Sequence, residues 1–487
     1  MLTFDNSYVR ELEGLYVFAQ AERTVAPTLV RLNVSLAQEL GLEPGELDSP
    51  DFVQYFSGNL IAPGSQPIAQ AYAGHQFGNF VPQLGDGRAL LLGEVIDRAG
   101  RRRDIQLKGS GRTAFSRSGD GKAALGPMLR EYLVGEAMHH LGIATTRGLA
   151  VVATGEPVYR ESALPGAVLT RVAASHIRIG TFEYFAARSD IASLKRLADY
   201  TMKRHYPELA GGGYIEFLRD FSMRLAGLVA DWMGAGFIHG VMNTDNMALS
   251  GETIDYGPCA FMEHYDPGTV FSSIDRNGRY CYGNQPAIAQ WNLARFAEAV
   301  LPLLDENEER AIELASKEVN DFREHYERAW LSVMRKKLGL RKMEEGDAVL
   351  AEGFLDAMYA AQSDFTLSWR RLADAAEGAE SSLRSLFAEN PEKLDAWLPL
   401  WLARLSREER PAKQVAADLR SINPLLIPRN YLVEEALEAA SSEGDLRPFD
   451  RLLEALSAPH AETGDTRSFS NPAPREHTAQ YRTFCGT

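Results

Sequence analysis

Cysteine is scarce in this sequence, with three in 487 residues. They are Cys259, Cys281 and Cys485, and no two of them have the C-x-x-C spacing of a zinc site. We therefore expect no structural zinc and a reducing compartment. A chain of this length can bury a large core and needs no such cross-link to fold.

Long apolar runs and an excess of positive charge are also missing. No apolar run approaches the roughly 18 residues of a membrane-spanning helix. The N-terminal segment has no basic stretch followed by an apolar core, and its acidic residues are unlike a transit peptide. The formal net charge of −15 argues against a general nucleic-acid or anionic-membrane binder. We expect a cytoplasmic monomer with neither a nucleic-acid nor a membrane partner.

The periodicity of apolar residues changes along the chain. Strand-like segments punctuated by glycine come first, and apolar residues with helical spacing dominate from Phe182 onward. This order predicts an α+β fold with a small β-rich part before a large helical part. The expected division is an N-terminal extension (1–69), a β-rich lobe (70–165), a helical lobe (166–458) and a polar tail (459–487).

Single elements follow from the same patterns. We expect strands at 89–95, 104–108, 151–160 and 166–172, and one amphipathic helix between residues 27 and 42, where leucines recur at helical spacing. A further helix is opened by Pro127 and ended by Gly142. Later helices are expected at 182–188, 191–206, 214–233, 291–304, 307–338, 348–361, 365–387, 392–406, 411–421 and 430–458.

Residues 236–257, GFIHGVMNTDNMALSGETIDYG, are the most informative stretch. Two short apolar runs flank Ser250-Gly251, which predicts a hairpin with a two-residue turn. In that register Asn246 faces Asp255, and directly opposed residues have Cα atoms about 4.5–5.5 Å apart. An amide oxygen and a carboxylate held this close suit Mg²⁺, with room for water and phosphate oxygens.

The same stretch resembles the catalytic half of a protein kinase, where H-R-D-x-x-x-x-N is followed by D-F-G. On that pattern His239 is the histidine, Asn246 the metal-binding asparagine and Asp255 the first residue of D-F-G. The catalytic base of a kinase falls on Val241, which cannot accept a proton. Asp245, directly before Asn246, is the alternative base.

Candidate phosphate-binding groups precede this stretch. Gly85 and Gly87 form a turn whose backbone N–H groups can approach phosphate. Lys108 ends the alternating strand that follows, where a kinase keeps its phosphate-binding lysine. Arg171 and Arg178 can bind phosphate oxygens bidentately. The same features also fit a plain hairpin, a solvated lysine and two surface ion pairs.

A kinase pairs its strand lysine with a glutamate from the following helix. In the helix predicted from Pro127, both Glu131 and Glu136 have suitable spacing. The spacing alone does not decide between them.

Four long motifs make the resemblance more specific. They are GHQFGNFVPQLGDGRA (74–89), LKGSGRTAFSRSGDGKAAL (107–125), REYLVGEAMHHLGIATTR (130–147) and NTDNMALSGETIDYGP (243–258). With them, almost the entire chain resembles selenoprotein O, a pseudokinase family of protein adenylyltransferases. The resemblance implies a kinase-like two-lobed fold that binds ATP flipped, with the γ-phosphate deep and the α-phosphate facing the acceptor. It also implies transfer of AMP to Ser, Thr or Tyr hydroxyls of protein substrates.

The resemblance further implies roles for individual residues. Asp245 is the catalytic base, Lys108 pairs with Glu131, and Asn246 and Asp255 bind Mg²⁺, or Mn²⁺ in its place. The implied nucleotide-binding set is Gly85, Gly87, Arg88, Lys108, Asp120, Gly121, Arg171, Arg178 and Asp255. Some bacterial members link their C-terminal cysteine to one in the activation segment. Here Cys485 would pair with Cys259 or Cys281, or stay a free thiol.

Two other functions compete with AMP transfer. One is transfer of the γ-phosphoryl group, as in protein and aminoglycoside kinases, which Val241 disfavours. The other is a nucleotide-binding scaffold without catalysis, which Val241 favours but the complete set of lysine, glutamate, asparagine and aspartate does not.

Overall fold

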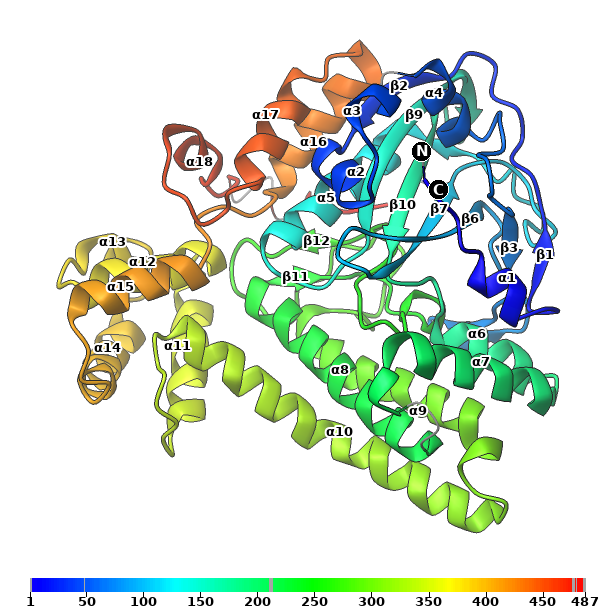
Figure 1. The fold of residues 1–487 in the computed structure, drawn as a ribbon. Helices are drawn as coiled ribbons and strands as arrows, with labels where there is room; N and C mark the ends of the chain where they lie inside the picture. Colours follow the sequence, from blue (N-terminus) through cyan, green and yellow to red (C-terminus); the bar gives the residue numbers. More distant parts are fainter. Residues whose placement is uncertain (1, 48, 210–212, 475–477, 479, 485–487) are drawn as a thin grey trace.

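The computed structural model describes residues 2–47, 49–209, 213–474, 478 and 480–484. One large antiparallel sheet lies in the upper part of Figure 1, and helices extend below and beside it. The predicted α+β class is therefore confirmed. In the described part of the chain, no helix is long and apolar enough to cross a membrane.

The large sheet has the strand order β1-β3-β6-β7-β10-β9-β2, and β8 pairs with β10. The four strands expected from sequence are all present, as β6, β7, β9 and β10. The strands of this sheet are β1 (Tyr16–Phe18), β2 (Thr28–Leu32), β3 (Ile68–Gln70), β6 (Ala89–Ile96), β7 (Arg102–Lys108), β8 (Ala123–Ala124), β9 (Arg147–Tyr159) and β10 (Ala163–Ala173).

The two faces of the sheet have different surroundings, as the alternation in β7 predicts. Ile105 and Leu107 are buried in a core with Phe52 of α4 (Pro50–Ser57). Gln106 and Lys108 point to the opposite face because successive side chains of a strand alternate. That face is covered by α5 (Leu125–His140), which contacts β9 and β10. Lys108 is thereby placed between sheet and helix.

The single helix expected between residues 27 and 42 is wrong. The segment forms strand β2 at the edge of the sheet, followed by the short helix α2 (Val34–Glu39). Asn33 separates them, because its side-chain oxygen accepts the N–H of Leu36 at 3.0 Å and caps the helix. Leucines three or four apart fit both arrangements, so their spacing did not reveal the break.

The helical body follows the expected pattern with two differences. The helix predicted at 365–387 is broken at Gly378, with φ of 86°, and that at 430–458 is broken at Gly444, with φ of 69°. The remaining helices are α1 (Ser7–Glu11), α3 (Pro44–Leu47), α6 (Ile179–Ala186), α7 (Ile191–His205), α8 (Tyr214–Ala235), α9 (Gln285–Leu304), α10 (Glu308–Lys337), α11 (Asp347–Ala361), α12 (Phe365–Ala376), α13 (Ser381–Ser385), α14 (Glu392–Ser406), α15 (Ala412–Ile422), α16 (Asn430–Glu438), α17 (Arg447–Leu456) and α18 (Gly464–Phe469).

The expected lobe boundaries fall within the sheet. β1 and β2 come from the first 69 residues and β10 crosses residue 165, so the sheet draws strands from three of the four expected segments. The division into lobes stays a prediction. The described part of the tail lies against the body, where the N–H of Thr483 donates to the carbonyl of Phe271 at 2.9 Å.

Lys337, the last residue of α10, predicts a pH-dependent stability. Its ammonium lies 4.9 Å from the ring centroid of Trp369 and 5.8 Å from that of Phe365. No carboxylate of the described residues forms an ion pair with it. Burial lowers the pKa of Lys337 from 10.5 to about 7. Between these values the unfolded chain holds the proton more tightly, so folding becomes more favourable as the pH rises through this window.

We expect Lys337→Met to raise the melting temperature by a few degrees at pH 7 and by much less near pH 10. The free energies of unfolding of wild type and variant should converge by roughly 1.4 kcal/mol per pH unit. Scanning calorimetry at both pH values measures this, with the exposed Lys413→Met as the control. If the difference in melting temperature between wild type and Lys337→Met did not change with pH, the lowered pKa of Lys337 would be contradicted.

Candidate functional site

The loop after α8 carries the candidate catalytic residues. α8 ends at Gly236, which takes the left-handed φ of 73° that favours glycine. β11 (Phe237–Ile238) follows and pairs with β12 (Ala260–Phe261). His239 comes directly after β11 and is buried in the core. The buried His239 donates from Nε2 to the carbonyl of Ile254 at 3.0 Å. This histidine therefore ties the loop to the segment that leads into Asp255.

The register expected for the following hairpin is wrong by one residue. Met247 pairs with Thr253, so Asn246 is opposite Ile254 rather than Asp255. The first apolar run also pairs on its other side, since Met247 and Leu249 exchange hydrogen bonds of 2.9 Å with residues 177–179. Because Met247 and Leu249 also pair with residues 177–179, the predicted tight two-residue hairpin does not form.

Asn246 and Asp245 lie in a single 3-10 turn, Thr244–Asn246. The side-chain amide of Asn246 donates to the carbonyl of Val241 at 2.9 Å, which leaves its own oxygen available as a ligand. Asp245 is 8% exposed, and its Oδ1 has no hydrogen-bond partner among the described residues. Burial raises the pKa of Asp245 to about 6, although Arg178 opposes this. The carboxylate is therefore more basic than an ordinary aspartate.

Asp255 is the centre of a buried charge cluster. Its Oδ1 contacts Lys108 Nζ at 3.3 Å and the guanidinium of Arg171, and its Oδ2 contacts Arg178 Nη1 at 2.9 Å. Burial alone would raise its pKa, but Arg171, Lys108 and Arg178 hold the pKa well below the usual range. Asp255 has a left-handed φ of 60°, which turns its carboxylate away from a regular strand. The structure thus brings together four residues that the sequence singled out.

Glu131 is the partner of Lys108. Its Oε2 lies 2.7 Å from Lys108 Nζ, and its Oε1 contacts Arg171. Glu136, the other candidate, pairs instead with Arg147 at 2.7 Å. With Asp255, the cluster holds three cations and two carboxylates, so one positive charge is in excess. Such a buried cationic site favours an anion.

The glycine turn is shaped by a neighbouring aromatic ring. A Cβ at Gly85 would lie 2.3 Å from Phe115, and one at Gly87 would lie 2.9 Å from the carbonyl oxygen of Phe115. Between them, buried Asp86 accepts the N–H of Gln70 at 3.0 Å. The sequence analysis missed Asp86, and its place between two glycines was the available signal.

The remaining candidates lie around this turn. Arg88 is half-buried. The pKa of Lys108 is lowered mainly by burial and by Arg171, and Arg88 is close enough to lower it further. Asp120 pairs with Arg160 at 2.8 Å, and Gly121 passes so close to Gly111 that a Cβ would meet its carbonyl oxygen at 2.1 Å. These contacts give Asp120 and Gly121 a structural reason for their identity. They do not test nucleotide binding.

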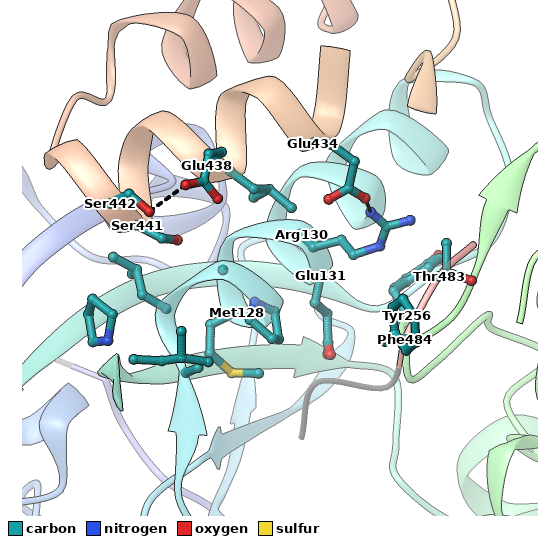
Figure 2. A pocket seen from close by; sticks show the side chains of 18 of the residues that line it. Met128, Arg130, Glu131, Tyr256, Glu434, Glu438, Ser441, Ser442, Thr483 and Phe484 are labelled. Carbon is teal, nitrogen blue, oxygen red and sulfur yellow. Dashed lines mark hydrogen bonds and ion pairs between the residues drawn. The ribbon is translucent and has the colours of Figure 1, made fainter. Parts of the chain in front are cut away.

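A cavity of about 650 Å³ opens beside the charge cluster. Lys108 and Glu131 belong to both. Figure 2 shows Glu438 and Ser442 on one side of it and Met128 and Glu131 on the other. The wall is made by the first turns of α5, the start of β10, residues 256–257, α16 with residues 441–442, and the tail residues 482–484.

A hairpin that received no role from the sequence contacts the loop that carries Asp245. β4 (Gly74–Gln76) and β5 (Asn79–Val81) form it. The N–H of His75 donates to Thr244 Oγ1 at 2.7 Å, and Gln76 Nε2 approaches Asp245 Oδ2 at 3.5 Å. A Cβ at Gly74 would lie 2.5 Å from Asp245 Oδ1. The motif beginning GHQF was visible in the sequence, but its contact with residue 245 was not.

The donor set fits a small divalent cation. Asn246 and Asp255 offer an amide and a carboxylate oxygen, the hard ligands that Mg²⁺ prefers together with phosphate and water oxygens. Among the described residues, no group of three or more histidine, cysteine, aspartate or glutamate side chains could hold a metal by itself. Magnesium brought in with a nucleotide matches this arrangement better than a dedicated all-protein site.

Cys485, the predicted partner of Cys259 or Cys281, lies outside the described residues. Cys259 and Cys281 form no disulfide with each other or with any other described residue. Burial raises the pKa of the Cys259 thiol to about 11, which disfavours the reactive thiolate.

The chain is similar to known proteins over nearly its whole length. Residues 1–457 match the family model described as "Protein adenylyltransferase SelO". Protein nucleotidyltransferase YdiU of Cereibacter sphaeroides strain KD131 is 61% identical over 487 residues, covering 99% of each chain. The Chromobacterium violaceum protein of the same name is 59% identical over 96% of this chain and 98% of its own. That of Rhizobium meliloti is 54% identical over 99% of both.

These similarities, with the buried cationic cluster, place the chain in the nucleotidyltransferase class of enzymes. More specifically, the chain belongs to the SelO family.

Proposed function

We propose that this protein transfers AMP from ATP to Ser, Thr or Tyr hydroxyls of proteins, within a kinase-like two-lobed fold. The observation that carries the proposal is the pairing of two features. Lys108, Arg171 and Arg178 converge on Asp255 as a phosphate site, while Asp245 and not Val241 supplies a buried carboxylate.

In the proposed step, the acceptor hydroxyl oxygen attacks the α-phosphorus. The new O–P bond forms as the bond from the α-phosphorus to the bridging oxygen of the β-phosphate breaks, and pyrophosphate leaves. Asp245 accepts the proton of the hydroxyl. A general base of this kind typically raises the rate by about 10²–10⁴-fold. The cations of the cluster stabilise the charge that spreads over the phosphate oxygens.

Mg²⁺, or Mn²⁺, would be held by Asn246 and Asp255. When bound, it neutralises phosphate charge and polarises the phosphoryl group. Arg171, Lys108 and Arg178 contact the same Asp255 carboxylate and would share it with the metal. These cations then become available to the phosphates, together with Arg88 and the backbone of Gly85 and Gly87.

The cavity beside the charge cluster is a candidate pocket for part of the nucleotide. It shares Lys108 and Glu131 with the phosphate site, and its apolar lining includes Leu125, Met128 and Leu437. At about 650 Å³ it is large enough for an adenosine group. We infer that ATP binds flipped, with the γ-phosphate deep in the charge cluster and the α-phosphate facing the acceptor hydroxyl beside Asp245.

Incubation with ATP labelled at either the α- or the γ-phosphorus tests the proposal. Label transferred to protein from the α position alone is the expected result. Label from the γ position alone would show a kinase, and no label from either would show an inert scaffold.

Glu131→Gln is expected to weaken Mg-ATP binding about tenfold or more, because Lys108 and Arg171 lose a shared charge-assisted partner. Glu136→Gln, five residues later on the same helix, is the matched control. It breaks a similarly buried ion pair, with Arg147, outside the cluster. Titration calorimetry of both variants measures the affinity, and equal losses would contradict a specific role for Glu131.

A further inference from the structure

Arg279 is a rigidly held cation beside the catalytic loop. It lies in the segment between β12 and α9. Its guanidinium carbon is 4.8 Å from the ring centroid of Trp291 and 5.6 Å from that of Tyr280. The same carbon lies 3.5 Å from the place a Cβ would take on Gly78, at the turn of the β4–β5 hairpin. Two aromatic rings and the hairpin therefore fix its position.

Arg279 has no carboxylate partner among the described residues. The nearest acid in sequence, Asp275, accepts the backbone N–H groups of Arg279 at 2.9 Å and Tyr280 at 2.7 Å. In a chain with 66 acidic and 51 basic residues, partners are abundant. Buried arginines elsewhere, such as Arg204 and Arg429, have them. Arg279 is thus ready to bind an anion from outside the chain.

Short contacts connect Arg279 to the candidate base. The hydroxyl of Tyr280 donates to Asn243 Oδ1 at 2.7 Å, and the N–H of Phe77 donates to the same atom at 3.0 Å. Asn243 is two residues before Asp245, which Gln76 approaches from the hairpin. Gln76 and Gly78 are two positions apart in the tight turn between β4 and β5, so at most roughly 7 Å separates them. A bound peptide would span the distance from Asp245 to Arg279 with a few residues.

The neighbouring surface suits a polypeptide. Phe80 of β5 is 41% exposed, and the ring of His75 lies between Phe80 and Trp291, with centroids 5.0 and 5.3 Å away. Aromatic residues and arginine are the side chains enriched at the energetic centres of protein interfaces. We define the Arg279 surface as His75, Phe80, Arg279 and Trp291.

We propose that the Arg279 surface docks the acceptor protein, and that Arg279 selects an acceptor hydroxyl with an Asp or Glu side chain a few residues away. This rests on the proposed transfer of AMP to protein hydroxyls. The partner is therefore an acidic, extended segment of another protein. Its carboxylate takes the place that an internal acid fills at Arg204 and Arg429.

Two fluorescein-labelled peptides test the surface, each with one central Tyr, flanked by Glu in one and by Lys in the other. Fluorescence anisotropy measures their binding to the full chain in the presence of Mg²⁺ and a non-hydrolysable ATP analogue. Wild type is expected to bind the Glu peptide about tenfold more tightly, the effect of one charge-assisted hydrogen bond. Arg279→Ala removes the preference, Arg279→Lys keeps part of it and Arg279→Glu reverses it.

Lys413→Glu, on exposed α15, changes the net charge far from this surface and should leave the preference intact. Equal binding of both peptides by wild type would overturn the proposal, as would weakened binding of the ATP analogue by Arg279→Ala. If α-labelled ATP gives no labelled peptide although the preference is present, the docking surface stands and the proposed reaction fails.

Discussion

Asp245→Asn is expected to reduce AMP transfer by about 10²–10⁴-fold, the usual worth of a general base, and to leave Mg-ATP affinity nearly unchanged. The amide has the shape of the carboxylate and fits beside Gly74, but it cannot accept the acceptor's proton. Asp245 makes no side-chain ion pair with the described cations, so its replacement should not disturb the charge cluster around Asp255.

Transfer of the α-label and calorimetric titration with Mg-ATP measure the two quantities separately. Asp199→Asn, on the exposed face of α7, serves as the control for a change of one charge. Unchanged transfer by Asp245→Asn would remove Asp245 from the mechanism and leave the phosphate site in place.

Asp255→Ala is expected to abolish the magnesium dependence of ATP binding and to destabilise the protein. The change removes a proposed metal ligand, leaves Lys108 and Arg171 with Glu131 alone, and leaves Arg178 without a carboxylate partner among the described residues. Breaking a buried ion pair from one side typically costs about 3–5 kcal/mol in free energy of unfolding. Calorimetric titration with and without Mg²⁺, together with thermal unfolding, measures both effects.

Asp364→Ala is the matched control for this loss of stability. Asp364 pairs with the fully buried Arg429 at 2.6 Å, outside the charge cluster. It should lower the melting temperature without changing the magnesium dependence of binding. If Asp255→Ala bound Mg-ATP as tightly as wild type, Asp255 would not be a metal ligand.

Local sequence patterns predicted much of the fold where one signal dominated. Alternation in β7 placed Lys108 on the face opposite Ile105 and Leu107, and Gly142 marked the end of α5. The leucines between residues 29 and 40 were misread because a 3–4 spacing describes both a helix and a strand followed by a helix. The cap at Asn33 was the deciding feature.

The site was predictable in composition but less so in geometry. Asp255, Lys108 and Arg171 were recognised one by one. Spacing left Glu131 and Glu136 open as partners of Lys108, the family resemblance implied Glu131, and the packing of α5 confirms it. The hairpin register failed because Met247 and Leu249 pair with residues 177–179, a partner far away in sequence. The contact between Gly74 and Asp245 joins residues that are even farther apart in the sequence, so no local pattern could predict it.

The first 32 residues supply both edge strands of the large sheet, β1 on one side and β2 on the other. A chain shortened to begin at the glycine-rich region would therefore expose two rows of unpaired backbone N–H and C=O groups. Such open borders invite pairing with other copies. Shortened forms of this enzyme should be handled as aggregation-prone material, and the N-terminal segment is best regarded as part of what keeps the enzyme in solution.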